Sequence, residues 1–221
     1  MFDQIPLRDD SLYTNPEPRC PVVLLLDSSA SMAGERIGEL NAGLKAFEAD
    51  LRADALAQKR CEIAVISFGE GVQLVTDFVA AKHYQTVQLT ASGQTPLGAA
   101  VERGLDLLAA RKTLYRQAGL KYYRPWLFLV TDGAPTDAWQ DAASRVREDE
   151  AGGHLAFFAF GVPGADFELL RQFSARRPPQ ALRGTPFREM FLWLSSSLKG
   201  VSRSAPGLAI QLHRPSEEWT L

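Results

Sequence analysis

Residues 22–31 read VVLLLDSSAS, an unbroken apolar run that ends in an aspartate followed by serine hydroxyls at positions 29 and 31. An apolar run this short, bounded by Pro21 and a polar cluster, is typical of a strand buried on both faces of a parallel sheet. A second run, residues 126–130 (WLFLV), ends in the same way, in Thr131-Asp132-Gly133. Parallel strands end at the same edge of a sheet, where open α/β folds bind ligands, so we expect Asp27 and Asp132 to lie together there.

The side chains at these two strand ends favour one kind of ligand. They offer carboxylate and hydroxyl oxygens, and no histidine or cysteine lies nearby in the sequence. Oxygen ligands without nitrogen or sulfur suit a hard divalent cation such as Mg²⁺. The pattern therefore predicts a cation site at the carboxyl edge of the sheet.

The same residues carry a family resemblance. Asp27-Ser28-Ser29-Ala30-Ser31 resembles the DxSxS motif of von Willebrand factor A (vWA) domains, Thr95 within residues 92–98 (SGQTPLG) resembles their threonine ligand, and Asp132 resembles their second aspartate. The resemblance covers roughly residues 20–200 and implies a metal-ion-dependent adhesion site. In that pattern Ser29 and Ser31 bind the metal directly, Thr95 binds directly or through water, and Asp27 and Asp132 act mostly through waters. It implies Mg²⁺, with Mn²⁺ or Ca²⁺ as substitutes, and an Asp or Glu carboxylate from a partner protein at the open position.

A narrower resemblance concerns residues 122–133 (YYRPWLFLVTDG) and 193–198 (WLSSSL). Both segments are similar to the bacterial stand-alone vWA proteins of the TerY/YegL type. That likeness implies a role in tellurite resistance or chemical stress, with a protein kinase-like and a metal-dependent phosphatase-like protein as partners.

Apolar periodicity and turn residues outline the rest of the fold. They predict one doubly wound α/β domain with a mostly parallel six-stranded sheet in the order 3-2-1-4-5-6, strand 3 antiparallel at one edge, and helices on both faces. Gly69-Glu70-Gly71 predicts the hairpin that makes strand 3 antiparallel, and Asp137 is expected to cap the helix that follows it. The expected strands are 21–27, 61–68, 72–78, 126–131, 154–160 and a short one after 178–179; the expected helices are 37–56, 96–111, 138–150, 166–173 and 187–199.

The chain divides into an extended N-terminal arm (1–19), the vWA-like domain (20–203) and a C-terminal tail (204–221). Within the tail, the alternating residues 208–212 are compatible with an added edge strand.

Composition limits the function classes. The 221 residues are 46% hydrophobic, enough for one domain with a sizeable core. A net charge of −2 argues against a general nucleic-acid binder. No apolar run approaches the ~20 residues that cross a membrane, and residues 1–18 do not resemble a signal peptide, so we expect a cytoplasmic protein. Cys20 and Cys61 begin neighbouring strands and are interpreted as buried thiols, with a redox pair as the alternative.

Three functions stay open: a non-catalytic binding module, a metal-dependent phosphatase or hydrolase, and a scaffold with a vestigial metal site. Phosphotransferases that use an aspartate after a central strand usually carry a second acid two residues later, but that position is Ser29. The GxSxG and nucleotide-binding glycine motifs are absent. A basic and aromatic group is compatible with a contact patch or with core packing beside a solvated loop; it comprises Tyr115, Arg116, Lys121, Tyr122, Tyr123, Arg124 and Trp126.

Overall fold

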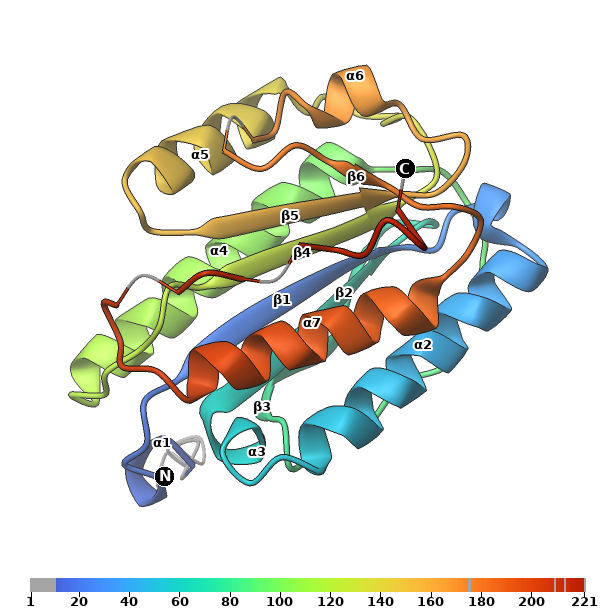
Figure 1. The fold of residues 1–221 in the computed structure, drawn as a ribbon. Coiled ribbons are helices and arrows are strands. Elements are labelled where there is room, and N and C mark those ends of the chain that lie inside the picture. Colours follow the sequence, from blue (N-terminus) through green and yellow to red (C-terminus); the bar gives the residue numbers. More distant parts are fainter. Residues whose placement is uncertain (1–10, 175, 209, 213, 221) are drawn as a thin grey trace, which may run out of the picture.

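The computed structural model describes residues 11–174, 176–208, 210–212 and 214–220. A six-stranded sheet in the order β3-β2-β1-β4-β5-β6 forms its centre (Figure 1). β3 is antiparallel to β2 and every other pairing is parallel, which confirms the predicted topology. The strands are β1 Cys20–Asp27, β2 Cys61–Phe68, β3 Val72–Ala80, β4 Trp126–Thr131, β5 Ala156–Gly161 and β6 Gln180–Ala181.

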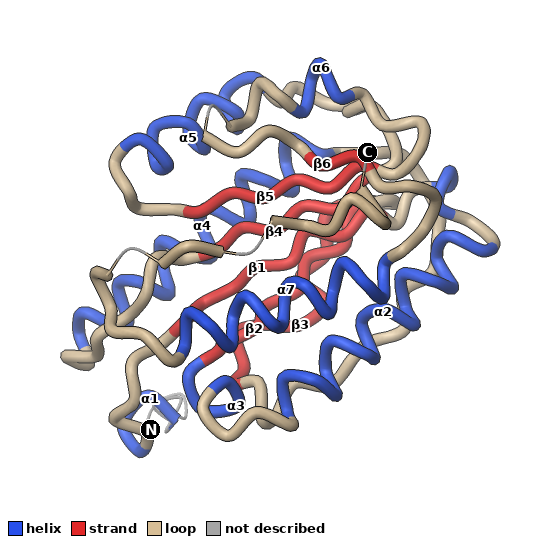
Figure 2. The backbone as a smooth tube through the Cα atoms, viewed as in Figure 1, coloured by secondary structure: helices blue, strands red, loops and turns tan. Residues whose placement is uncertain are grey.

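Helices cover both faces of the sheet (Figures 1 and 2). Val22, Leu24 and Leu26 of β1 pack in the core beneath α2 and α7, whereas Val23 and Leu25 pack in the core beneath α4 and α5. Because strand side chains alternate between faces, a strand buried on both sides must be apolar throughout, as β1 is. The helices are α1 Ser11–Thr14, the 3-10 turn η1 Ala30–Met32, α2 Glu35–Arg52, α3 Ala57–Arg60, α4 Leu97–Gln117, α5 Gln140–Ala151, α6 Phe167–Leu170 and α7 Phe187–Ser202.

Two local predictions were wrong for reasons that involve distant residues. Asp137 does not cap α5, which begins at Gln140; its carboxylate instead accepts the N–H groups of Gly98 and Ala99, at 2.9 and 2.8 Å, in the first turn of α4. The helix predicted to end near residue 111 continues to Gln117. The added turns bring Tyr115 onto the carboxylate of Glu62, which is 1% exposed and already contacts Arg111.

The two ends of the chain pack against the domain. Residues 1–10 of the predicted arm lie outside the described residues; from residue 11 the arm contains the short helix α1, and Arg19 forms a bridge with Tyr122. In the tail, Leu208 and residues 210–212 form no strand, while Thr220 forms an antiparallel bridge with Leu182. No helix within the described ranges is both long and apolar enough to cross a membrane.

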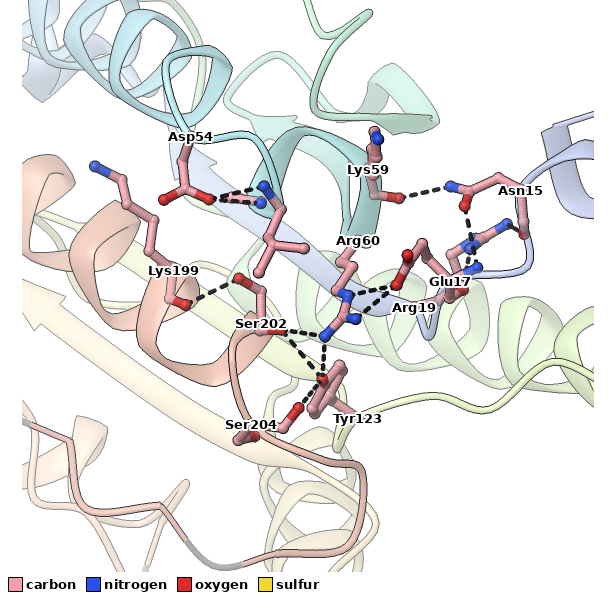
Figure 3. Close-up of polar contacts among 12 residues, drawn as sticks. Asn15, Glu17, Arg19, Asp54, Lys59, Arg60, Tyr123, Lys199, Ser202 and Ser204 are labelled. Carbon is pink, nitrogen blue, oxygen red and sulfur yellow. Dashed lines mark hydrogen bonds and ion pairs between the residues drawn. The ribbon is translucent and has the colours of Figure 1, made fainter.

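At the amino end of the parallel strands, polar contacts tie the arm to α3, α7 and the segment before β4 (Figure 3). Arg60 of α3 donates to the Glu17 carboxylate, the Tyr123 hydroxyl and the Ser202 carbonyl. The Tyr123 hydroxyl donates to the Ser204 carbonyl at 2.6 Å. Cys20 and Cys61 lie opposite each other in the β1–β2 register as buried free thiols. Their hydrogen bond, together with burial, raises the pKa of Cys61 well above its usual value.

Candidate metal centre

Asp27 ends β1 as a fully buried carboxylate with both oxygens hydrogen-bonded. The backbone N–H of Ser29 donates to Oδ1 at 2.9 Å, and the Thr131 hydroxyl donates to Oδ2 at 2.6 Å. Since Thr131 ends the neighbouring strand β4, these contacts join the two strand ends that the sequence singled out.

Ser29, Ser31 and Asp132 form a continuous chain of oxygen atoms above Asp27. The Oγ atoms of Ser29 and Ser31 lie 3.0 Å apart, and the Ser31 hydroxyl donates to Asp132 Oδ1 at 2.7 Å. The Asp132 backbone nitrogen lies 3.4 Å from Asp27 Oδ2. Four of the five predicted site residues therefore converge at the carboxyl edge of the sheet.

Thr95 reaches the same edge through the loop that precedes α4. The Ser92 N–H donates to the Ser28 carbonyl at 2.8 Å, and the Ala30 N–H donates to the Gly93 carbonyl at 3.1 Å, so this loop is fastened to the serine loop. Gly93 has φ +78°, and a Cβ there would lie 2.4 Å from the Glu70 nitrogen, so the close approach requires glycine.

The Thr95 hydroxyl lies beside the residue that follows Asp132. A Cβ placed on Gly133 would be 3.3 Å from Thr95 Oγ1. The Thr95 N–H donates to the Thr136 hydroxyl, and the Thr95 carbonyl accepts the Thr136 N–H, which holds Thr95 in position. Within the described residues this hydroxyl makes no hydrogen bond to the other four side chains. Thr95 thus lies at the same edge as the other four predicted residues, next to Gly133.

The sequence reasoning missed Arg36. Its Nη1 lies 2.6 Å from Asp132 Oδ2, and its Nη2 donates to the Pro163 carbonyl at 3.1 Å. The Asp132 side chain is fully buried, while that of Arg36 is 34% exposed. Arg36 belongs to no motif, and the only available signal was its place in the first turn of the helix after the serines.

The electrostatics of the site favour an added cation. Burial raises the pKa of Asp27, hydrogen bonds from Ser29 and Thr131 lower it, and the nearby Asp132 charge raises it further, with a net upward shift. The cost therefore falls on the charged form of Asp27, because a buried carboxylate loses its hydration. A positive ion beside the two carboxylates would offset that cost.

The residues present fit a Mg²⁺-type ion. They bring two carboxylates and three hydroxyls, all oxygen donors, and Mg²⁺ prefers few carboxylates together with waters. Clusters of three or more His, Cys, Asp or Glu side chains suited to a metal are absent from the described residues, so this centre depends on its hydroxyl groups. Of the described histidines, His154 precedes β5 at the opposite end of the sheet and His83 follows β3.

A family model for the von Willebrand factor type A domain matches residues 22–187, which include every residue of this site. The chain belongs to the von Willebrand factor type A domain family. Domains of this family are typically protein-binding or adhesion modules with a metal-ion-dependent adhesion site. A comparison with curated proteins finds no match.

Solved structures with this vWA fold come from varied organisms. The open form of the pilus adhesin SpaC from Lactobacillus rhamnosus GG has a TM-score of 0.69 at 15% identity, over 85% of this chain and 31% of that one. Proximal thread matrix protein 1 from the mussel byssus has a TM-score of 0.54 at 16% identity, over 83% and 49%. Manganese-loaded TRAP protein from Plasmodium vivax has a TM-score of 0.54 at 18% identity, over 72% and 64%. Identities this low show a shared fold alone, and this chain spans less than two thirds of each.

Proposed function

We propose that this vWA domain is a non-catalytic, metal-dependent protein-binding module. Its adhesion site would consist of Asp27, Ser29, Ser31, Thr95 and Asp132 and would hold Mg²⁺, or Mn²⁺ or Ca²⁺ in its place. The observation that carries the proposal is the unbroken oxygen chain from Ser29 through Ser31 to Asp132, set against buried Asp27. When bound, the ion supplies an electrophilic position that takes an Asp or Glu carboxylate from the partner.

Each residue has a separate task in this proposal. Ser29 and Ser31 supply neutral hydroxyl ligands from a short turn, and Thr95 supplies a third from the loop that precedes α4. Asp27 and Asp132 orient the ion's water shell, which second-shell carboxylates commonly do. Two carboxylates balance the charge of a divalent ion, while the neutral hydroxyls leave it able to attract one further carboxylate.

Arg36 gives the site a positive charge before any metal arrives. Its guanidinium lies on Asp132 Oδ2 and bridges to the segment after β5 through the Pro163 carbonyl. A cation that uses the Asp132 carboxylate must share it with Arg36 or displace the guanidinium into solvent, where one third of that side chain already lies. Either way, the contact between Arg36 and Asp132 opposes metal binding.

The site offers no groups positioned for catalysis. It contains hydroxyls and carboxylates, but the described histidines lie elsewhere and the position two residues after Asp27 is a serine. The competing function is a metal-dependent phosphatase or hydrolase. Hydrolysis of p-nitrophenyl phosphate that requires Mg²⁺ and disappears in Asp27→Ala would favour that alternative; we expect no turnover.

We place this activity in the cytoplasm, in a bacterial tellurite-resistance or chemical-stress complex with kinase-like and metal-dependent phosphatase-like partners. Support for this setting is the resemblance of residues 122–133 and 193–198 to TerY/YegL-type proteins. A scaffold whose metal site is vestigial is the remaining alternative.

The test compares wild type with Thr95→Ala as baits in a lysate of the native host, each in Mg²⁺ and in EDTA. We expect a protein that wild type retains only in Mg²⁺, with weaker retention by Thr95→Ala, because that change deletes one ligand from a loop without opening the core. Thr113→Ala, an exposed threonine on α4, is the matched control and should behave as wild type. Equal retention in all four main conditions would favour the scaffold with a vestigial site.

A further inference from the structure

A cavity lies at the opposite end of the sheet from the metal centre. It has a volume of about 620 Å³ and is lined by residues from the carboxyl end of α4, the starts of β4 and β5, and the tail. These segments lie at the left in Figure 1. Five of the seven residues of the basic and aromatic group noted in the sequence line it: Arg116, Tyr122, Tyr123, Arg124 and Trp126. We propose that this cavity, the basic groove, binds an acidic peptide segment of a partner protein without any metal.

Charge is the first observation behind this proposal. Cationic side chains from several separate elements line the groove, and Asp149 is the one acid among its lining residues. That local excess contrasts with the net charge of −2 of the whole chain. Like charges gathered in one concave site repel one another, and an anionic ligand removes that cost while gaining charge-assisted hydrogen bonds. The cationic residues are Lys112, Arg116, Arg124 and Arg177, with His154 beside them.

Three of these cations, Lys112, Arg116 and Arg124, form no ion pair within the described part of the chain. Arg116 donates to the Thr113 hydroxyl on its own helix, whereas half-buried Lys112 and exposed Arg124 make no side-chain hydrogen bond among the described residues. Arg177 differs, because its Nη1 lies 2.7 Å from Glu150 Oε1 and its guanidinium lies 5.0 Å from the centre of the Phe158 ring. Arg177 is therefore held in place by contacts within the chain, and we expect Lys112 and Arg124 to contact the bound peptide.

The lining also contains apolar side chains, which is why a peptide fits better than an inorganic anion or a nucleic acid. Trp126 and Val201 are buried, Ile210 and Leu212 are half-buried, and Leu208 is 67% exposed beside them. An acidic segment with leucine-like side chains matches both this surface and the cationic rim. A nucleic acid would meet a chain whose net charge is negative, and a lone phosphate would leave the apolar lining uncovered.

The groove and the metal centre can act independently. β4 begins at Trp126, which lines the groove, and ends next to Asp132 of the metal centre, a distance of about 20 Å at ~3.3 Å per residue. No metal-centre residue lines the groove. Binding in the groove should therefore persist in EDTA, which separates this inference from the proposed adhesion function.

The experiment measures fluorescence anisotropy of a labelled twelve-residue peptide of alternating Glu and Leu, titrated with the full chain in EDTA. We expect saturable binding that the double variant Lys112→Glu/Arg124→Glu weakens at least tenfold. The matched control is Lys45→Glu/Arg103→Glu, which changes net charge equally at exposed positions on α2 and α4 and should leave affinity within about twofold. Thermal melts of both variants check that the fold is kept.

Several results would overturn the inference. Equal weakening by the groove and control variants would show only a general charge effect. Equal binding of a Lys/Leu peptide would show that anionic charge is not recognised. Binding of pyrophosphate or a single-stranded oligonucleotide in the groove, with none of the Glu/Leu peptide, would assign the groove to a phosphate ligand instead.

Discussion

Replacing Arg36 by methionine should strengthen Mn²⁺ binding, because the change removes a cation that the chain itself places on Asp132. The contact joins Arg36 Nη1 to Asp132 Oδ2 at 2.6 Å, and the guanidinium is further held by the Pro163 carbonyl. Methionine keeps much of the apolar stem but carries no charge. Mn²⁺ would then bind without displacing a competitor from the carboxylate.

The size of the expected gain in Mn²⁺ affinity follows from the solvent exposure of Arg36 and Asp132. A hydrogen bond to a charged group contributes ~1.5–3 kcal/mol when well shielded. Asp132 is buried but the Arg36 side chain is 34% exposed, so solvent screening reduces the contribution to about 1 kcal/mol. Since 1.4 kcal/mol is a factor of ten, we expect Mn²⁺ to bind about fivefold more tightly. The metal-free variant should lose a similar free energy of unfolding, because Asp132 is left without its cation.

Calorimetric titration with MnCl₂ and thermal melting in EDTA measure both effects. The control Arg103→Met removes an exposed arginine of α4 that has no ion pair within the described residues, and it should change neither quantity. An Arg36→Met variant with unchanged or weaker Mn²⁺ affinity and an unchanged melt in EDTA would refute competition at Asp132. A loss of metal-free stability without any gain in affinity would mean that Arg36 supports the fold but moves away at no cost.

Three further predictions concern the rest of the molecule. Asp132→Ala should weaken Mn²⁺ binding ~10–100-fold by calorimetry, as the loss of a second-shell carboxylate typically does; an unchanged isotherm would exclude Asp132 from the site. Glu62→Gln should lower the free energy of unfolding in urea by ~3 kcal/mol or more, because buried Arg19 and Arg111 lose their shared carboxylate. The control Glu168→Gln, on an exposed ion pair, should have little effect. Cys20 and Cys61 should resist a thiol reagent at pH 8 in the native state and both react in urea, since they are fully buried and the pKa of Cys61 is raised; fast native labelling would revive the redox interpretation.

Local sequence pattern was sufficient to predict the sheet order. Each central strand carries its own evidence, since the apolar runs of β1 and β4 lead into Asp27 and Asp132, and the Gly-x-Gly turn after β2 specifies a hairpin. The site residues within the motif could also be predicted from the sequence, because Asp27, Ser29 and Ser31 are neighbours in the chain. The structure brings Thr95 and Asp132 to the same edge, as expected from strands and loops that end there.

Features that depend on distant partners could not be predicted from the local sequence. Arg36 contacts Asp132 across 96 positions of the sequence, and Asp137 caps α4 across 39. The carboxyl-terminal turns of α4 persist because Arg111 and Tyr115 satisfy buried Glu62, about 50 residues earlier in the chain. In each case the local pattern was compatible with several outcomes, and the buried partner decided between them.

Without metal, the metal centre should repel an acidic partner, whereas the basic groove at the other end of the sheet should attract it. Without metal, Asp27 and Asp132 face an incoming carboxylate, and Arg36 is the cation paired with Asp132 among the described residues, so the ion is needed to turn repulsion into attraction. The basic groove attracts the same chemistry with or without metal. If one partner carries two acidic segments, joined by at least the ~20 Å that separate the sites, binding at the groove raises the effective concentration of the second segment at the metal centre. Chelation should then reduce the affinity for such a partner to that of the groove alone rather than abolish it, and Lys112→Glu/Arg124→Glu in EDTA should weaken the remaining binding at least tenfold.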